Sequence, residues 1–489
     1  MAAISLISLQ ILLVVYYCYF SFYNYLYSLA SLFNYKFKTA PLNGKKVAVV
    51  IVCFNEYEVI QDTIRSCEML TYDNKMIIVG DDSNDDKTYD LLLNIADSKG
   101  CMKLTTEHPT YESETFVLFH RKHNYGFKAG NLKELEQYLK SNDFDYMYLL
   151  DADWRPQKDV IEKCLAVMEA DEKIAFVQTK RIYSRSNFLE KCLALSEEAC
   201  YFVDMPGRQS MGDPILFTGC CALFRLKALF AVGGFQPGHL TEDIDLTNRI
   251  YLQGYKGVYL QDAINEGEVP PNYKSFRKQQ ERWVMGSARS LKDHSLSILC
   301  SRVLTLRQKL GLLRQNAYFT SSVVIELSII FAFISIIFLL LSTVDNFQAT
   351  MYLYYLNSYE IPLSILVFFA LLSNFIPLLI TVCKRKSFQD LVLIPYATWL
   401  SWSVLHTTCI ANIKGFFGFH SEWFKTPKTN RTHTAKKLSM EGSNAIRFFN
   451  FLTLAILIFI YSVEWVYFGL FDIYALFWIP ALTIGILLS

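Results

Sequence analysis

The stretch Val47-Ala-Val-Val-Ile-Val-Cys53 decides the fold of this chain. It is a continuous apolar run rich in β-branched residues, which is typical of a strand buried on both faces. Two further runs of this kind occupy Met76–Gly80 and Tyr146–Leu150, and segments of helical character at 58–70 and 128–140 lie between the three runs. Buried strands that alternate with helices predict an open α/β sheet of parallel strands.

Polar side chains follow each of the three predicted strands. They are Asn55 and Glu56 after the first strand, Asp81 and Asp82 after the second, and Asp151 and Asp153 after the third. One such cluster alone is equally well explained as a helix cap or a turn. Ligands of open α/β sheets bind beyond the carboxyl ends of the strands. Three clusters at equivalent positions therefore predict a ligand site at that edge.

Charged residues are distributed unevenly along the 489 residues. Residues 1–44 carry 2 of them, residues 45–318 carry 73 and residues 319–489 carry 18. The middle is charged like an ordinary soluble domain, whereas the flanks are apolar enough for lipid. The formal net charge of +1 leaves no basic excess to neutralise a nucleic acid, so we expect none as a partner. The composition also excludes a disordered chain.

Residues 1–35 contain no charged side chain, and their apolar run is long enough to cross a bilayer. Lys36, Lys38, Lys45 and Lys46 follow immediately. By the positive-inside rule we expect the N-terminus outside and the middle domain in the cytosol. A cleaved signal peptide is the alternative, but no Lys or Arg precedes the apolar run and no A-x-A site follows it.

Five apolar runs follow the soluble domain, at 319–341, 360–383, 390–413, 448–469 and 471–488. Basic residues flank the third run on both sides, so we expect it to re-enter or to lie along the interface, which leaves five crossings in total. The basic and apolar residues of Leu296–Arg314 predict an amphipathic helix on the membrane surface. The predicted segments are a membrane helix (1–35), a cytosolic α/β domain (45–290), an interface helix (291–318), two membrane helices (319–383), an interfacial segment with a cytosolic loop (384–446) and two further membrane helices (447–489).

The triplet Asp151-Ala-Asp153 suits a divalent cation that is shared with a diphosphate, because carboxylate oxygens are hard ligands and leave coordination positions open. Other short motifs accompany it in order: Phe54-Asn-Glu56, Asp81-Asp-Ser83, Lys128-Ala-Gly-Asn131, Thr241-Glu-Asp243 and Gln279-Gln-Glu-Arg-Trp283. The series resembles the processive family 2 membrane glycosyltransferases of the cellulose synthase-like superfamily, and among them the glucan and mannan synthases. Trp423-Phe-Lys-Thr-Pro-Lys428 is similar to their gating-loop signature.

This resemblance implies a GT-A-type, Rossmann-like domain and a role for each motif. The implied donor nucleotide-binding residues are Phe54, Asn55, Glu56, Asp81, Asp82, Lys128, Asp151, Gln279 and Arg282. Asp153 with Asp151 would hold Mg²⁺ or Mn²⁺. Asp243, with Glu242 beside it, would be the catalytic base of an inverting transfer. The implied acceptor residues are Phe217, Thr218, Gly219 and Trp283, and those of the gating loop are Trp423, Thr426 and Lys428.

Several of these residues have a structural alternative. Asp243 precedes the apparent start of a helix, where a carboxylate also serves as a cap. Trp283 is equally an aromatic anchor at a membrane boundary. Glu326 and Glu464 lie within predicted membrane helices, where a carboxyl group is a functional candidate, although a protonated structural role explains it as well.

The leading hypothesis is a metal-dependent hexosyltransferase that elongates a β-linked polysaccharide and passes it across the membrane. UDP-glucose and GDP-mannose both fit as donors, and the short site implied by Phe54 and Asp81 favours UDP-glucose. We expect the growing polysaccharide and the lipid bilayer as further partners, at a plasma or Golgi membrane. The alternative is a non-processive enzyme that transfers one sugar to a lipid, as ceramide glucosyltransferases do. A transporter or receptor would not need these motifs together.

Overall fold

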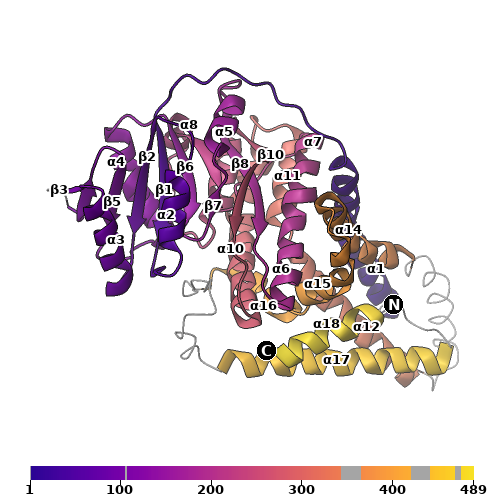
Figure 1. The fold of residues 1–489 in the computed structure, drawn as a ribbon. Helices are drawn as coiled ribbons and strands as arrows, with labels where there is room; N and C mark the ends of the chain where they lie inside the picture. Colours follow the sequence, from indigo (N-terminus) through magenta and orange to yellow (C-terminus); the bar gives the residue numbers. More distant parts are fainter. Residues whose placement is uncertain (1, 105–106, 343–364, 420–440, 469–474, 489) are drawn as a thin grey trace.

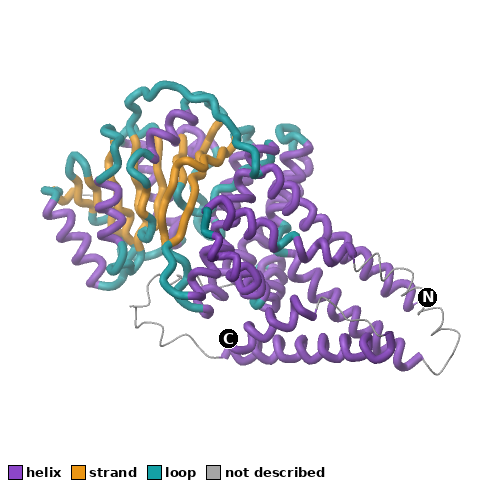
Figure 2. Tube along the Cα trace, turned by 45° about the vertical axis from the view of Figure 1, so that its right-hand side comes forward, coloured by secondary structure: helices purple, strands orange, loops and turns teal. Residues whose placement is uncertain are grey.

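The computed structural model describes residues 2–104, 107–342, 365–419, 441–468 and 475–488. A β-sheet with helices on both faces occupies one end of the molecule, and the other end consists of helices alone (Figures 1 and 2). Both chain termini lie at the helical end. This division confirms the expected combination of an α/β domain with a helical membrane region.

The strands of the described residues form one sheet. Their bounds are β1 (Val47–Cys53), β2 (Lys75–Asp81), β3 (Met102–Leu104), β4 (Thr110–Glu112), β5 (Phe116–His120), β6 (Tyr146–Asp151), β7 (Arg155–Pro156), β8 (Ile174–Tyr183), β9 (Ala222–Arg225) and β10 (Lys256–Gly267). Their order is β3-β4-β5-β2-β1-β6-β9-β8-β10-β7. The three predicted strands are β1, β2 and β6, and β1 lies between the other two and parallel to both.

The sheet is mixed, which corrects the expectation of parallel strands throughout. β9 runs antiparallel to both of its neighbours, β6 and β8. The chain enters β9 through a tight turn in which Gly219 and Cys221 both have positive φ, a conformation that costs a non-glycine residue energy. The sequence pattern does not reveal this reversal, because a buried antiparallel strand is as apolar as a buried parallel one.

Two layers of helices cover the sheet. They are α2 (Ile60–Glu68), α3 (Asp86–Ser98) and α5 (Val160–Met168) on one face, and α4 (Phe127–Ser141), α8 (Leu226–Ala231) and α9 (Glu242–Leu252) on the other. Val47, Val49 and Ile51 of β1 pack into the first core, whereas Ala48 and Val50 pack into the second. Because successive side chains of a strand point to opposite faces, two buried faces require the continuous apolar run seen in the sequence.

Helices connect the sheet domain to the membrane region. They are α6 (Phe188–Ala199), a short π-helix η1 (Cys200–Asp204), α7 (Met205–Met211), α10 (Tyr273–Cys300) and α11 (Leu306–Asn316). The predicted domain boundary at residue 290 therefore lies inside α10. The expected single interface helix is two helices, since Thr305 caps the start of α11 in a capping box with Gln308.

Arg314 of α11 lies in the protein interior rather than toward lipid headgroups. Its Nη2 is 3.0 Å from Asp213 Oδ2, and its guanidinium stacks 3.5 Å from the ring centroid of Tyr23. Tyr23 belongs to the N-terminal helix α1 (Ala2–Ala30), whose Tyr27 hydroxyl also donates to Asp213. The basic residues of a predicted amphipathic segment thus serve, in part, to join α1 to the sheet domain.

Further helices are α12 (Thr320–Ser342), α14 (Phe375–Arg385), a 3₁₀ helix η2 (Phe388–Val392), α15 (Leu393–Trp402), α16 (Leu405–Phe417), α17 (Glu441–Phe468) and α18 (Ala475–Leu488), and residues 365–372 are helical as well. Three stretches of the described residues are long and apolar enough to cross a membrane: Thr320–Ile337, Ile365–Arg385 and Asn444–Val463. They support the expected membrane region. Crossings by α1 and α18, which complete the expected five, stay predictions.

The run at 390–413 is divided between α15 and α16, neither of which has the length of a crossing. α15 packs against α6, and α16 packs against α10. The second contact is close, because a Cβ added to Gly415 would lie 2.3 Å from the carbonyl oxygen of Met285. This arrangement fits the expectation that the segment does not cross, which remains a prediction.

Candidate active site

The predicted polar clusters meet at one edge of the sheet. In the strand register Cys53 lies opposite Asp81, and Val52 lies opposite Asp151. The residues after β1, β2 and β6 therefore leave the sheet side by side, as predicted. Asn55 joins two of the loops, since its side chain accepts the backbone N–H of Asn84 at 2.9 Å. Its positive φ of 54° makes it part of a tight turn that leaves Phe54 and Glu56 half-buried at the same edge.

Asp81 and Asp82 point inward, which differs from the role that the resemblance implied. Asp81 is fully buried and accepts from the Ser83 hydroxyl at 2.6 Å, and His120 Nδ1 lies 2.8 Å from its other oxygen. Asp82 accepts two hydrogen bonds from Arg121, at 2.7 and 2.6 Å. Burial raises the pKa of Asp82, and Arg121 offsets only part of that effect. Both carboxylates thus hold the loops together, and neither is open to a nucleoside in this structure.

Lys128 stands at the centre of the edge, at the start of α4. Its ammonium group forms an ion pair with Asp151, donates to the carbonyl oxygen of Gly219 at 2.8 Å and lies 3.8 Å from Glu242 Oε1. Burial lowers the pKa of Lys128, but the charges of Asp151 and Glu242 more than compensate, so that its pKa is raised. Lys128 therefore stays charged and is positioned to exchange a carboxylate for a phosphate.

Asp243 is the second residue of α9 and lies close to the turn before β9. A Cβ added to Gly219 would be 3.5 Å from Asp243 Oδ2. Burial and the neighbouring charge of Glu242 raise the pKa of Asp243 to about 7, against the lowering effects of Lys128 and Arg282. Asp243 is not the N-cap residue of α9, because Thr241 occupies that position. Asp243 does accept a hydrogen bond from the N–H of Ile244 at 2.9 Å. A carboxylate with such a pKa is suited to accepting a proton near neutral pH.

Gln279, Arg282 and Trp283 share one side of α10, as their spacing of three and four residues requires. Gln279 is buried, and the other two are half-buried. The charge of Arg282 acts on Asp243, so this side of α10 borders the base. One turn further, a Cβ added to Gly286 would lie 2.2 Å from the side chain of Thr241. Glycine at this position lets α10 pack directly on the start of α9.

The predicted acceptor residues divide into two groups. The side chain of Phe217 is only 1% exposed and packs against the rings of Phe176, Phe224 and Phe235, which removes it from the acceptor set. Gly219 does border Lys128 and Asp243, and Thr218 directly precedes it in the chain. Trp423, Thr426 and Lys428, the predicted gating-loop residues, lie outside the described residues.

Comparison with known families supports this geometry. The family model described as Glycosyl transferase family group 2 matches residues 146–411, which is more than half of the chain. The chain belongs to the family 2 glycosyltransferases. The model described as Glycosyl transferase family 2 matches residues 48–231. The mixed sheet and these matches confirm the expected GT-A-type domain and the glycosyltransferase family that the motifs indicated.

Curated plant proteins are similar to this glycosyltransferase. "Probable glucomannan 4-beta-mannosyltransferase 14" of Arabidopsis thaliana is 30% identical over 310 residues, which cover 62% of this chain and 55% of that protein. "Glucomannan 4-beta-mannosyltransferase 9" of the same plant is 28% identical over 54% of this chain and 48% of its own length. The chain thus spans about half the length of the curated relatives it matches.

Among solved structures, a mannosyltransferase from Pyrobaculum calidifontis in complex with GDP-Man and Mn²⁺ aligns with a TM-score of 0.47 and 15% identity. The alignment covers 79% of this chain and 98% of that chain.

The carboxylates after β6 have the donor chemistry for a divalent cation of this glycosyltransferase. The side chain of Asp151 is 36% exposed and forms an ion pair with Lys128, whereas Asp153 is 3% exposed. Among the described residues no group of three or more His, Cys, Asp or Glu side chains could hold a metal alone. Mg²⁺ and Mn²⁺ commonly take one or two carboxylates and complete their coordination with phosphate oxygens. The residues fit a cation that binds together with a nucleotide.

Sequence reasoning missed His120 and Arg121, which bind the two aspartates after β2. They could have been found as polar residues at the carboxyl end of a strand, as for the other loops, because they lie at the end of β5, which neighbours β2 in the sheet.

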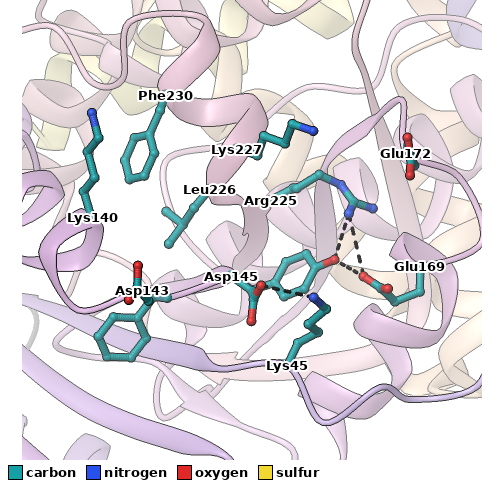
Figure 3. A pocket seen from close by; sticks show the side chains of 12 residues that line it. Lys45, Lys140, Asp143, Asp145, Glu169, Glu172, Arg225, Leu226, Lys227 and Phe230 are labelled. Atoms are coloured by element: carbon teal, nitrogen blue, oxygen red, sulfur yellow. Dashed lines mark hydrogen bonds and ion pairs between the residues drawn. The ribbon is translucent and has the colours of Figure 1, made fainter.

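A cavity of about 440 Å³ lies at the opposite edge of the sheet, where β6 begins (Figure 3). Its walls carry Lys45, Asp145 and a cluster in which Arg225 donates to the hydroxyl of Tyr146 at 2.8 Å. None of the predicted site residues lines this cavity. It is separate from the candidate active site, since it lies at the amino end of β6 and Asp151 lies at the carboxyl end.

Proposed function

We propose that this chain is an inverting hexosyltransferase that transfers the sugar of a nucleoside diphosphate sugar to a β-linked polysaccharide. The observation that carries the proposal is the cluster of Lys128, Asp151, Glu242 and Asp243 at the carboxyl edge of the sheet. It combines a cation for a diphosphate with a carboxylate whose pKa, about 7, suits a base. Family membership supports the same reaction class.

In this mechanism the acceptor hydroxyl attacks the anomeric carbon of the donor. The new bond joins the acceptor oxygen to that carbon, the bond from the carbon to the diphosphate oxygen breaks, and Asp243 Oδ2 takes the hydroxyl proton. One displacement inverts the anomeric centre. Lys128 and Arg282 stabilise the charge that develops on the leaving diphosphate. A cation held by Asp151 and Asp153 would, when bound, neutralise part of the same charge.

We place GDP-mannose first among the donors and a mannan or glucomannan first among the products. The support is the names of the plant relatives, which are mannosyltransferases. The preference for UDP-glucose rested on Phe54 and Asp81, and the burial of Asp81 weakens it. UDP-glucose remains the second donor to test.

We further propose a cytosolic catalytic domain, an outside N-terminus, five crossings and transport of the polymer through the helices, in a plasma or Golgi membrane. The three candidate spans support a membrane location. Within this region the carboxyl group of Glu326 in α12 contacts Nδ1 of His406 in α16. The pair joins a candidate span to a helix that packs on α10, which carries Arg282. The side chain of Glu464, the other carboxyl group predicted here, lies outside the described residues.

The test offers purified protein in detergent a panel of labelled sugar nucleotides with Mg²⁺ or Mn²⁺. We expect GDP-mannose label in a large polymer that a mannanase digests. Label confined to a lipid extract would replace the proposal with the non-processive alternative. Absence of transfer from every nucleotide would overturn both. The same panel offered to Asp243→Asn tests the base, and Asp73→Asn, an exposed change at the amino end of β2, controls for the loss of one carboxylate elsewhere in the domain.

A further inference from the structure

Arg181 of β8 is a buried cation behind the candidate site. Its Nη2 donates to the carbonyl oxygens of Thr218 at 2.7 Å and Cys220 at 2.5 Å. The guanidinium lies between two rings, 4.9 Å from the centroid of Trp154 and 5.4 Å from that of Tyr201. Among the residues that the structure describes, no carboxylate pairs with it. Burying a charge without a counter-ion is costly, so the contacts that Arg181 does make need an explanation.

The contacts of Arg181 fall on one short piece of backbone. The carbonyl groups of Thr218 and Cys220 point toward Arg181, while the carbonyl of Gly219 between them accepts from Lys128 at 2.8 Å. The turn is therefore held between two cations, one behind the site and one within it. The hydroxyl oxygens of Tyr201 and Thr218 lie 3.0 Å apart, so an aromatic neighbour of Arg181 binds the same turn.

This turn also borders the base. Gly219 has a φ of 91°, and a Cβ added to it would be 3.5 Å from Asp243 Oδ2. Trp154, the other ring beside Arg181, directly follows Asp153 in the chain. A displacement of the turn would thus move the backbone beside Asp243, while Lys128 keeps its ion pair with Asp151.

Arg181 is not the sole support of the turn. Gln178 accepts the N–H of Thr218 at 3.0 Å and donates to the carbonyl oxygens of Cys220 and Cys221 at 3.1 and 3.0 Å. These neutral bonds come from the same strand. We expect the turn to form without Arg181, with its exact position relaxed.

We propose that Arg181 is a positioning residue that holds the Thr218–Cys220 backbone against Lys128 and Asp243, so that a saccharide acceptor is presented to the base. The inference rests on the proposed function, since it concerns the acceptor of that reaction. It predicts that loss of Arg181 impairs attack by a saccharide hydroxyl more than attack by water, which needs no such placement.

The experiment compares full-length Arg181→Lys and Arg181→Gln with Arg225→Lys. Lysine keeps the charge of Arg181 but lacks the planar guanidinium that lies against the rings of Trp154 and Tyr201 while its Nη2 donates to two carbonyl groups. Arg225 is a matched control, because it also donates to backbone carbonyl oxygens, those of Met168, Asp171 and Ile174, at the opposite edge of the sheet. Three quantities are measured: transfer to a manno-oligosaccharide, hydrolysis of the same nucleotide sugar, and affinity for GDP with Mn²⁺.

We expect both Arg181 variants to lose at least tenfold in kcat/KM for the oligosaccharide, while hydrolysis and GDP affinity stay within about twofold of wild type. Arg225→Lys should transfer like wild type. Normal transfer by the Arg181 variants would overturn the inference about Arg181 but not the proposed function. A loss of GDP affinity as large as the loss of transfer would do the same. If Arg181→Gln does not fold, Arg181→Lys decides. Wild-type protein that transfers to no saccharide would overturn the proposed function as well.

Discussion

Replacement of Asp243 by asparagine should abolish transfer and at the same time stabilise the protein above neutral pH. The carboxyl group of Asp243 has a pKa raised from 3.8 to about 7 by burial and by Glu242. A raised pKa in an acid means that the folded state binds a proton more tightly than the unfolded state. The ionised form of Asp243 therefore destabilises the fold, and an uncharged amide relieves that cost.

The magnitude follows from the shift. The rise in the pKa of Asp243 from 3.8 to about 7 sets an upper bound of about 4 kcal/mol on the gain from Asp243→Asn, at ~1.4 kcal/mol for each tenfold change in proton affinity. The amide must itself be buried, so we expect roughly 2 kcal/mol. The gain should be complete above pH 7, shrink between pH 7 and pH 4, and vanish below pH 4, where the carboxyl group is protonated in both states. Loss of a general base should lower transfer at least ~100-fold.

The assay records the Tm of purified wild type, Asp243→Asn and Asp73→Asn from pH 4 to pH 8.5, with transfer measured on the same samples. Wild-type transfer should rise as pH passes 7, because Asp243 must be ionised to accept a proton. A Tm for Asp243→Asn that equals or falls below wild type at pH 8 would refute the electrostatic argument. Retained transfer in that variant would refute the assignment of the base.

Three further substitutions test separate parts of the site. Lys128→Met should weaken GDP binding in the presence of Mn²⁺ at least tenfold, measured by calorimetry, because it removes the central cation of the cluster; unchanged affinity would contradict that role. Arg121→Met should lower the free energy of unfolding by about 3–5 kcal/mol, since it leaves buried Asp82 without its ion pair, and an unaltered denaturation midpoint would show that the pair is dispensable. Phe217→Ala should lower the free energy of unfolding by about 3–5 kcal/mol, because it leaves a cavity in the core. The KM of the folded enzyme for the acceptor should stay unchanged, and a selective rise in that KM would show that Phe217 does bind the acceptor.

The strands, the ligand edge and the family could be predicted because their signals are local. Val47–Cys53 is apolar at every position, which requires two buried faces wherever the strand lies in the sheet. The clusters after β1, β2 and β6 then share an edge as soon as the strands are parallel neighbours. Charge counts likewise separate the sheet domain from the membrane helices, because lipid excludes charge over a whole segment.

Which of the edge residues remain open to a ligand was settled by contacts between distant segments. Asp82 and Asp151 look alike in the sequence, yet Arg121, which follows β5, binds the first and Lys128 from α4 binds the second. The reversal of β9 buries Phe217 and exposes Gly219 to Lys128 and Asp243, and no local pattern encodes that reversal.

The strand pattern and the motif order thus follow from the sequence alone, because burial periodicity and residue chemistry are properties of single segments. Only the tertiary structure determines the pKa of Asp243, the counter-ions of the aspartates and the hydrogen bonds from Arg181 to the turn before β9. Each depends on desolvation and on charges brought within a few ångströms by separate elements, which depend on how those elements pack.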